Sequence, residues 1–309
     1  MNAQAENLMI TPVLRGELRF DVAMAAHVSW RAGGRAEQVY VPADLTDLQA
    51  FMQSDRVREP LAFIGLGSNL LVRDGGFAGT LVLLHRALGR IELERVRGDL
   101  GVVYAEAGVS SPKLARFAAR HDLVGAEFLA GIPGTLGGAL AMNAGCYGRE
   151  TWEIVSQVLT LDRAGTLKKR SPKDFHVGYR HVEPVLPRAE WFVAAWLMLP
   201  RGDGAVSRQE IKRLLAARVA SQPLELPNAG SVFRNPPGDH AARLIESCGL
   251  KGRTIGGAQV SEKHANFIVN TGGATATDIE TLIDQVEATV AERTGVRLQR
   301  EVRILGERV

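Results

Sequence analysis

The chain has 309 residues, 46% of them hydrophobic and 23% charged, and its formal net charge is +3, which is ordinary for a soluble globular protein of about two or three domains. Its longest basic run is Lys168-Lys169-Arg170, too short for a nucleic-acid-binding stripe, so we expect a small-molecule ligand and no nucleic acid. The two cysteines, Cys146 and Cys248, form no CxxC motif, and we find neither an apolar signal region nor a long apolar run, which favours a cytoplasmic protein without a membrane span.

Strands alternate with helices in the first part of the chain, after an expected N-terminal segment at 1–28. Thr46 and Gln49 have the spacing of a capping box, which predicts a helix at about 46–54. A Ser-Pro pair at 111–112 opens a second helix. Short strands are predicted at 37–42, 61–65, 80–85, 90–96 and 100–108.

The second part begins with a predicted hairpin over 153–171, whose strands flank an Asp-Arg-Ala-Gly turn. One more buried strand is predicted at 191–200. Ser207 and Glu210 then have capping-box spacing and the composition changes, so we place a domain boundary near 203. The remaining predicted elements are helices at 207–220 and 240–248, a strand at 266–270, a helix at 278–294 that ends at Gly295, and a strand at 296–305.

The stretch GIPGTLGGALAMNAG, residues 131–145, combines five glycines with several apolar residues. It is too apolar for a flexible linker and too rich in glycine for a regular helix or strand. Tight turns would account for a lone Gly-Gly pair. Here apolar residues hold the loop from behind and Thr135 and Asn143 add polar groups, a pattern that suits a backbone cradle for a bulky anion such as a diphosphate.

A second glycine loop, GLGSNL at 65–70, lies in the same predicted region. It lacks one glycine of the dinucleotide-binding fingerprint and leads into a predicted strand rather than a helix, which excludes a Rossmann fold. The sequence has no P-loop, and its seven histidines show no metal-binding spacing, so we expect no metal. Two glycine loops that converge on one diphosphate cofactor would account for both.

Seven segments, in order along the chain, resemble the UDP-N-acetylenolpyruvoylglucosamine reductase family. The chain has no long insertion between Arg180 and Ser231, so it is most similar to the shorter, type II members. The segments are SWRAGG (29–34), GLGSNLLV (65–72), AGIPGTLGGALAMNAGCYG (130–148), GYR (178–180), AGSVFRNP (229–236), GGAQVSEKHANFIVN (256–270) and REVRILG (300–306).

The resemblance implies an α+β fold with an FAD-binding region of the vanillyl-alcohol-oxidase (PCMH) type. That region would span 29–202 as two α/β subdomains, at about 29–88 and 89–202, and a substrate-binding α/β domain would follow at 203–309. FAD is the implied cofactor, and NADPH is the implied co-substrate. The residues implied to bind FAD are Arg31, Gly65, Gly67, Ser68, Asn69, Gly131, Pro133, Gly134, Thr135, Gly137, Gly138, Asn143 and Ala144.

The implied reaction reduces UDP-N-acetylglucosamine enolpyruvate to UDP-N-acetylmuramate, a step of peptidoglycan synthesis. Hydride addition to a double bond conjugated with a carboxylate leaves negative charge on the adjacent carbon, which needs a stabilising cation and then a proton. By resemblance, Arg180 supplies the cation, Ser231 supplies the proton, and Glu301 completes the catalytic set. Alternation along the predicted strand at 296–305 places Glu301 on the face opposite the apolar residues.

Further residues are assigned by the same resemblance. Val182 stands where the family usually has a small hydroxyl residue, and Cys146 stands where alanine is usual; we interpret Cys146 as a packed apolar residue rather than a nucleophile. We expect a monomer. The candidates for binding the diphosphate and sugar of the substrate are Tyr179, Arg234, Asn235, Gln259, Lys263, His264 and Asn266.

Two alternatives stay open at this point: another FAD oxidoreductase of the same fold, and a non-catalytic protein that binds a flavin or a nucleotide sugar. The segment 229–270 argues against the first, because by resemblance it belongs to the nucleotide-sugar domain. The joint presence of Arg180, Ser231 and Glu301 argues against the second.

Overall fold

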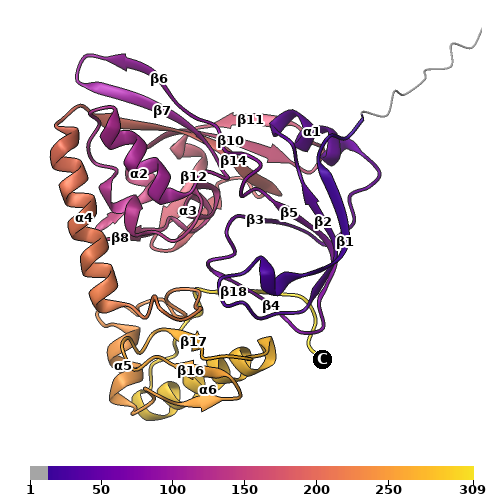
Figure 1. Ribbon diagram of the computed structural model, residues 1–309, viewed down its shortest axis with the longest axis vertical. Coiled ribbons are helices and arrows are strands. Elements are labelled where there is room, and N and C mark those ends of the chain that lie inside the picture. The colour runs from indigo at the N-terminus through magenta and orange to yellow at the C-terminus, as the bar shows by residue number, and fades with distance from the viewer. Residues whose placement is uncertain (1–12) are drawn as a thin grey trace, which may run out of the picture.

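The computed structural model of the protein describes residues 13–309. A four-stranded sheet, a five-stranded sheet with its helices, and a smaller C-terminal domain form three groups of elements (Figure 1). Residues 1–12 of the expected N-terminal segment lie outside the described residues. Within the described part of the chain, no helix combines the length and apolar character that a membrane span requires.

The four-stranded sheet has the order β1-β2-β5-β3. Strand β1 pairs antiparallel with β2, whereas β5 pairs parallel with both β2 and β3. Part of the expected N-terminal segment is therefore an edge strand of this sheet. The elements are β1 (Glu17–Ala23), the 3-10 helix η1 (Met24–Ala26), β2 (Arg35–Val41), β3 (Leu61–Ile64) and β5 (Phe77–Leu83).

Helix α1 (Leu45–Gln53) joins the two large sheets, because its buried side chains share a core with residues of both. The capping box expected at Thr46 was wrong. Asp44 is the N-cap, and its carboxylate accepts a hydrogen bond from the N–H of Asp47 at 2.9 Å. Aspartate is as good an N-cap as threonine, and it comes first in the chain.

The five-stranded sheet has the order β11-β10-β14-β7-β6, and all of its pairings are antiparallel. The predicted hairpin is confirmed as β10 and β11. Its first strand starts two residues later than expected, because the 3-10 helix η3 (Thr151–Ile154) comes before it. The strands are β6 (Ile91–Arg97), β7 (Leu100–Glu106), β10 (Val155–Asp162), β11 (Leu167–Arg170) and β14 (Glu190–Pro200).

Three helical elements share a core with this sheet: α2 (Ser111–Arg120), the 3-10 helix η2 (Glu127–Gly131) and α3 (Leu136–Met142). Helix α3 contradicts the expectation that 131–145 is too rich in glycine for a helix. A Cβ added at Gly137 would lie 2.9 Å from the Cβ of Ala107, so this glycine allows close packing of the helix.

Two short hairpins follow α3. The first is formed by β8 (Gly145–Cys146) and β9 (Arg149–Glu150). The second comes after the 3-10 helix η4 (Pro172–Asp174). It consists of β12 (Phe175–Gly178) and β13 (His181–Pro184), with Tyr179 and Arg180 at its tip.

Helix α4 (Gly204–Ser221) runs from the five-stranded sheet region to the C-terminal domain (Figure 1). Its predicted cap, Ser207, was wrong, because the carboxylate of Asp203 accepts the first N–H bonds, including that of Ala205 at 2.6 Å. Ser207 is buried and bonds to Glu127 of η2. The helix that follows the expected boundary near 203 thus packs against α2 and η2.

The C-terminal domain packs two helices against the antiparallel sheet β15-β16-β17. The predicted end of its long helix is confirmed: Gly295 is the C-cap, with a φ of +73° that suits glycine. The elements are α5 (Ala241–Ser247), β15 (Thr254–Ile255), β16 (Ala258–Val260), β17 (Ile268–Asn270) and α6 (Ala276–Thr294).

The strand predicted at 296–305 is shorter than expected. Only β18 (Arg303–Leu305) pairs, in parallel with β4 (Leu70–Val72). The predicted alternation is still correct, because Leu298 and Val302 are buried in the domain core. Residues 303–305 therefore join the C-terminal domain to β4, at the end of the glycine loop at 65–70.

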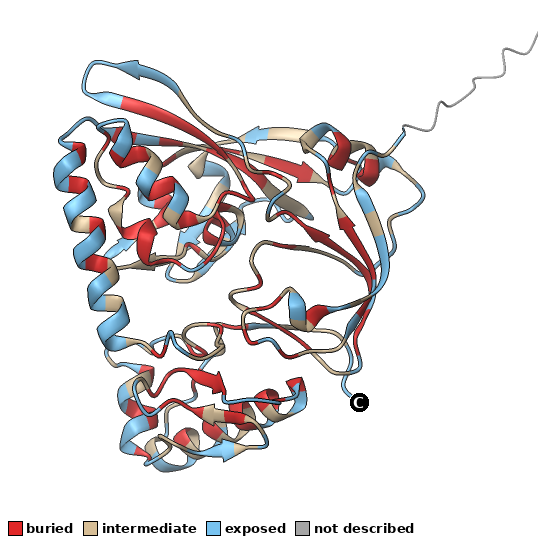
Figure 2. Ribbon diagram, viewed as in Figure 1, coloured by how far each residue is buried: buried red, intermediate tan, exposed pale blue. Residues whose placement is uncertain are grey.

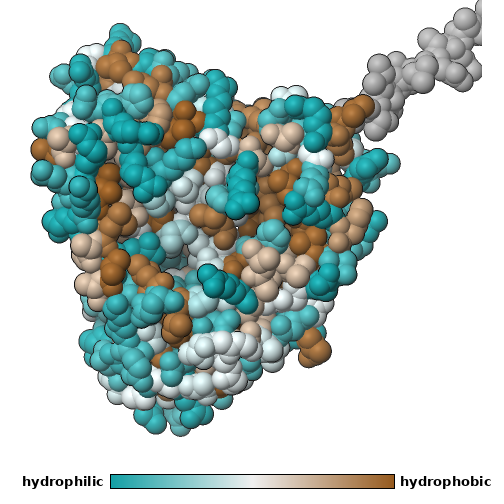
Figure 3. All heavy atoms as spheres, in the orientation of Figure 1, coloured by the Kyte–Doolittle hydropathy of each residue, from teal (hydrophilic) through white to brown (hydrophobic). Residues whose placement is uncertain are grey.

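Buried residues occur in all three groups of elements (Figure 2). The cores that they form cross the expected domain boundaries. Trp30, Ala32 and Leu71 belong to the core of the C-terminal domain. The indole N–H of Trp30 donates to the carbonyl of Ile268 at 2.7 Å. On the face shown in Figure 3, hydrophilic and hydrophobic side chains are interspersed over the surface.

Candidate active site

The two glycine loops lie side by side. A Cβ added at Gly65 would lie 2.3 Å from the Oγ1 of Thr135, and one added at Gly134 would lie 3.3 Å from the Oγ of Ser68. Because these positions lack side chains, the loops approach each other closely. The convergence expected from the sequence is therefore present in the structure.

One glycine of α3 is left open. A Cβ added at Gly138 would meet no atom closer than 4.0 Å, where it would approach the Oγ1 of Thr135. Gly137, by contrast, packs against Ala107. The open position beside the loop junction fits a ligand that lies against the backbone, as the diphosphate cofactor would.

A cavity of about 340 Å³ lies next to the loop junction. Three of the residues expected to bind FAD line one side of it: Arg31, Ser68 and Pro133. Arg218 near the end of α4 and residues 224–228 and 230 also line the cavity. This volume, shared by cofactor loops and the C-terminal domain, is suited to a cofactor or a nucleotide.

Arg180 occupies the tip of the β12–β13 hairpin, where its φ is +53°. Its Nε donates to Oε1 of Glu301 at 2.9 Å, and its NH2 group donates to the carbonyl of Gly145 at 2.8 Å. The NH1 group donates to the carbonyl of Asn143 at 3.4 Å. The structure thus pairs two residues of the expected catalytic set directly, although 121 positions separate them.

Glu301 is mostly buried, with 17% of its side chain exposed. This burial raises the pKa of the Glu301 carboxyl, and the charge and hydrogen bond of Arg180 partly oppose the effect. The backbone carbonyl of Glu301 accepts from the Nδ2 of Asn69 at 3.1 Å. Glu301 therefore connects the glycine loop at 65–70 to Arg180.

The segment that carries Ser231 runs alongside Glu301. The N–H of Glu301 donates to the carbonyl of Val232 at 2.8 Å. Asn266 holds this segment from the other side, since its amide donates to the carbonyl of Phe233 at 2.8 Å and accepts from its N–H at 3.0 Å. Ser231 is half-buried and lies two residues before Phe233, which makes this double contact.

Three of the expected substrate residues, Arg234, Tyr179 and Asn235, lie near Glu301 or contact the segment of Ser231. The Nε of Arg234 is buried and has no hydrogen-bond partner within residues 13–309. Arg234 also acts on the carboxyl of Glu301, whose pKa its charge lowers in opposition to burial. The hydroxyl of Tyr179 accepts from the N–H of Asn235 at 3.4 Å, so the hairpin tip contacts the segment of Ser231.

The other expected substrate residues make contacts within the protein. Asn266 is 4% exposed and both groups of its amide bond to Phe233, which suits a positioning role. The Nζ of Lys263 donates to the carbonyl of Val219 at 2.8 Å. His264 accepts from the N–H of Asn266 at 3.3 Å, and Gln259 makes only long contacts, at 3.4 and 3.5 Å.

Two of the expected cofactor residues, Asn143 and Ala144, have polar groups that are bonded within the protein. The side chain of Asn143 bonds to Glu150, Gly178 and Trp152. The carbonyl of Ala144 accepts from both the N–H and the hydroxyl of Thr151.

Both departures from the family pattern are packed residues. Val182 and Cys146 lie against the core of the five-stranded sheet region. The thiol of Cys146 donates to the carbonyl of Phe128 at 2.9 Å, and burial raises its pKa to about 11. Such a thiol is inert as a nucleophile, in agreement with the sequence interpretation.

Arg218 is one of the lining residues of the cavity that sequence reasoning missed, and it carries the second guanidinium of the lining. Burial lowers the pKa of its guanidinium, whose Nε donates to Gln222 at 2.9 Å. A signal was available, because Arg218 lies shortly before Pro223, where the segment that lines the cavity begins.

Comparisons with known proteins cover both parts of the chain. An FAD-binding domain family matches residues 36–171, and the C-terminal domain of UDP-N-acetylenolpyruvoylglucosamine reductase matches residues 222–305. A UDP-N-acetylenolpyruvoylglucosamine reductase of Thiobacillus denitrificans is 62% identical over 306 residues, covering 96% of this chain and 94% of the relative. One of Methylococcus capsulatus is 60% identical and covers 92% of this chain and 91% of the relative.

A solved structure gives the same result. The crystal structure of UDP-N-acetylenolpyruvylglucosamine reductase (MurB) from Thermus caldophilus superposes with a TM-score of 0.79 at 29% identity, over 95% of this chain and all of that one. It confirms the α+β fold expected from the sequence, and the matched FAD-binding domain confirms FAD as the cofactor. The chain belongs to the UDP-N-acetylenolpyruvoylglucosamine reductase family of flavin-dependent oxidoreductases.

Proposed function

We propose that the chain catalyses the NADPH-dependent reduction of UDP-N-acetylglucosamine enolpyruvate to UDP-N-acetylmuramate, and that Arg180, Ser231 and Glu301 carry the chemistry. One observation supports these roles above all: the guanidinium of Arg180 is bonded to Glu301, and the backbone of Glu301 is bonded to the segment of Ser231. The segments that carry the three residues come from distant parts of the chain, and the carbonyl of Glu301 also accepts from Asn69 of the glycine loop at 65–70.

Arg180 has donors to spare for a substrate carboxylate. A guanidinium carries five N–H groups, and three of them donate to Glu301, Asn143 and Gly145. The two that remain can grip the carboxylate of the enolpyruvyl group. This charge would then stabilise the enolate that forms after hydride addition.

We assign the delivery of the proton to Ser231. FAD held between the glycine loops would supply the hydride to one carbon of the double bond. The neighbouring carbon then carries negative charge and is a strong base, so a positioned hydroxyl is acid enough to protonate it. Glu301 holds the guanidinium of Arg180 in place for this step.

Arg234 is suited to an anionic part of the substrate. Its Nε is buried without a hydrogen-bond partner among the described residues, and a buried donor without a partner costs about 1–3 kcal/mol. A bound phosphate or carboxylate oxygen would remove that cost. We therefore assign Arg234 to substrate binding.

NADPH as the hydride donor and the cytoplasm as the compartment are parts of the same proposal. Both cysteines are free thiols, as expected in a reducing compartment. We also keep the sequence expectation of a monomer.

The decisive experiment separates the two half-reactions in anaerobic stopped-flow. The purified protein should be yellow and should release a flavin on denaturation. NADPH should bleach it, and the enolpyruvyl nucleotide should then restore the colour. The proposal fails if the protein takes up no FAD, or if the reduced protein is not reoxidised by this nucleotide.

A further inference from the structure

Asn143 is a buried polar residue at the end of α3. It is 1% exposed, and it is the C-cap of α3, with a left-handed φ of +41°. Its Nδ2 donates to Oε2 of Glu150 at 2.7 Å and to the carbonyl of Gly178 at 3.1 Å, and its Oδ1 accepts from the N–H of Trp152 at 3.1 Å. Both N–H donors of its amide are thus in use.

Asn143 contacts both the backbone segment that carries Arg180 and the guanidinium of Arg180. Gly178 is the last residue of β12, two positions before Arg180, so its bond to Asn143 fixes the base of the hairpin tip. The backbone carbonyl of Asn143 accepts from NH1 of Arg180, so the same residue also holds the end of the side chain. The backbone and the guanidinium of Arg180 are therefore both tied to one residue at the end of α3.

Arg180 needs such support because its backbone is in an unfavourable conformation. A non-glycine residue in the left-handed region costs about 1–2 kcal/mol, and Arg180 has a φ of +53°. Strain of this kind persists only where surrounding contacts determine the conformation. The bond from Asn143 to Gly178 is one of those contacts.

We propose that Asn143 is a positioning residue for Arg180: it carries no substrate or cofactor itself, and it sets where the guanidinium meets the substrate. Asparagine suits this position because it tolerates the left-handed region and its amide both donates and accepts. The inference rests on the catalytic role proposed for Arg180.

Two single variants remove the Gly178 bond in different ways. Asn143→Gly keeps the left-handed backbone and deletes the amide. Asn143→Asp keeps the shape but sets a carboxylate against Glu150 and the carbonyl of Gly178. The matched control is Asn270→Asp, another buried amide, whose Nδ2 donates to the carbonyl of Trp30 at 2.9 Å, away from the hairpin.

Both Asn143 variants should keep FAD and be reduced by NADPH at the normal rate. Reoxidation by the enolpyruvyl nucleotide should slow by about 10²-fold, the effect of a misplacement of about 1 Å. Amide hydrogen exchange at 178–181 should accelerate, which reports the loosened hairpin independently of turnover. Asn270→Asp should lower the melting temperature without slowing reoxidation selectively.

A double variant separates positioning from folding. In Asn143→Asp/Glu150→Gln the new glutamine can donate to the new carboxylate, so the melting temperature should recover. The carbonyl of Gly178 still lacks its donor, so reoxidation should stay slow. Recovery of both quantities would show that Asn143 acts only through the fold and would overturn the inference.

The variant Arg180→Lys distinguishes a failure of the inference about Asn143 from a failure of the role proposed for Arg180. If this variant slows reoxidation and neither Asn143 variant does, the inference fails while the proposed role of Arg180 stands. If Arg180→Lys also leaves reoxidation unchanged, the role of Arg180 fails first. Loss of FAD from Asn143→Gly in a folded protein would return Asn143 to the cofactor role expected from the sequence.

Discussion

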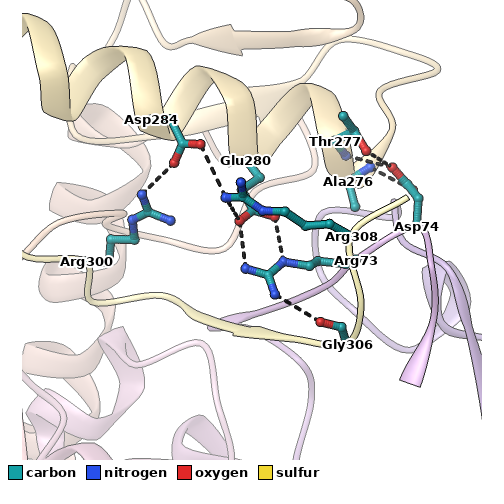
Figure 4. A network of polar contacts seen from close by, with 9 residues as sticks. All are labelled: Arg73, Asp74, Ala276, Thr277, Glu280, Asp284, Arg300, Gly306 and Arg308. Carbon is teal, nitrogen blue, oxygen red and sulfur yellow. Dashed lines mark hydrogen bonds and ion pairs between the residues drawn. The ribbon is translucent and has the colours of Figure 1, made fainter. Parts of the chain in front are cut away.

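Two glutamates of the C-terminal domain pair with arginines of other regions, and their surroundings shift the pKa of the two carboxyl groups in opposite directions. Glu280 of α6 bonds to Arg73 at 2.8 Å (Figure 4). Hydrogen bonds from Arg73 and Arg308 lower the pKa of the Glu280 carboxyl to about 2. Burial instead raises the pKa of Glu301, even though Arg180 contacts it.

The surroundings of these two glutamates define two seams. The outer seam joins the domain to the four-stranded sheet region through the β4–β18 pairing and through the ion pair between Glu280 and Arg73. Asp74 adds to this seam, because its carboxylate accepts from the N–H of Ala276 at 3.1 Å and of Thr277 at 2.7 Å (Figure 4). The inner seam joins the C-terminal domain to the β12–β13 hairpin and to α4 through side-chain contacts. Arg180 and Tyr179 of the hairpin contact Glu301 and Asn235, and Lys263 contacts Val219 of α4.

This difference separates stability from chemistry. At the outer seam the ionised carboxylate is favoured, so its charge contributes to folding. At the inner seam burial disfavours the charge, which is typical of functional sites. The proposed catalytic contact between Arg180 and Glu301 thus lies at the inner seam, which is held by individual side chains. A substrate can compete there for the N–H donors of Arg180.

The largest expected effect is at Ser231. Ser231→Ala should be reduced by NADPH at a near-normal rate, because that half-reaction takes no proton from this hydroxyl. Reoxidation by the enolpyruvyl nucleotide should fall by about 10²–10⁴-fold, the usual loss for a general acid. Stopped-flow absorbance of the flavin measures both rates. Slow reduction with normal reoxidation would contradict the proton-donor role.

Removal of Arg180 should come next. Arg180→Ala should lower turnover by about 10²–10³-fold, as for one preorganised charge-stabilising donor, and should keep its flavin, since the glycine loops are formed by other residues. The ratio of flavin to protein absorbance and steady-state kinetics measure these effects. A folded apoprotein would mean that Arg180 holds the cofactor.

Glu280→Gln tests the outer seam. The carboxylate has 6% of its side chain exposed, and breaking a buried pair from one side costs about 3–5 kcal/mol; Arg73 is 29% exposed, so we expect the lower end, about 3 kcal/mol. Urea unfolding measures the loss, and both half-reactions should be unchanged. The control is Glu210→Gln, in an exposed pair with Arg213, where no measurable loss of stability is expected. Equal effects would remove the distinction between the seams.

Local features were predictable because neighbouring residues determine them. The hairpin of β10 and β11 and the C-cap at Gly295 follow from residues next to each other in the chain. The two N-caps were misplaced, because a good capping residue, Asp44 or Asp203, comes a few positions before the one with capping-box spacing. Spacing alone cannot rank them.

Long-range features depend on partners that the pattern does not name. β18 pairs with β4, more than 200 residues earlier, so its short length was not visible in the alternation of 296–305. The pairing of Arg180 with Glu301 is of the same kind: the motifs indicated both residues, and the structure adds their contact. The buried hydrogen bonds of Asn143 were likewise invisible, since they come from Glu150, Trp152 and a backbone carbonyl.

The pH dependence of stability should have opposite signs at the two glutamates. The folded pKa of Glu280 lies near 2, below its ordinary value of 4.5, so its contribution is present above 4.5 and is lost as pH falls toward 2. The stability gap between wild type and Glu280→Gln should close over that window. The folded pKa of Glu301 is raised, so wild type should lose stability relative to Glu301→Gln as pH rises past 4.5. Urea unfolding of wild type and of each variant, from pH 2 to above 4.5, measures how the two stability differences change with pH. If both differences change in the same direction with pH, the comparison of the two glutamates is contradicted.

The smallest expected effect is at Lys263, on the inner seam. Its Nζ bonds to the carbonyl of Val219 at the end of α4, and the contact is exposed. Lys263→Met keeps most of the apolar stem and removes the charge, so the free energy of unfolding should change by less than about 0.5 kcal/mol. Asp74→Ala, which removes the acceptor for the first two N–H groups of α6 at the outer seam, should cost about 1 kcal/mol.

The same variant decides whether Lys263 is more than a seam contact. If the sequence-based assignment to the substrate diphosphate is correct, the side chain must leave Val219 when the nucleotide binds. Lys263→Met should then raise KM for the enolpyruvyl nucleotide and leave the rate of reduction by NADPH unchanged. An unchanged KM together with an unchanged stability would remove Lys263 from the substrate set. A stability loss as large as that of Asp74→Ala would show instead that the inner seam is fastened as firmly as the outer one, and the separation of stability from chemistry would no longer hold at this position.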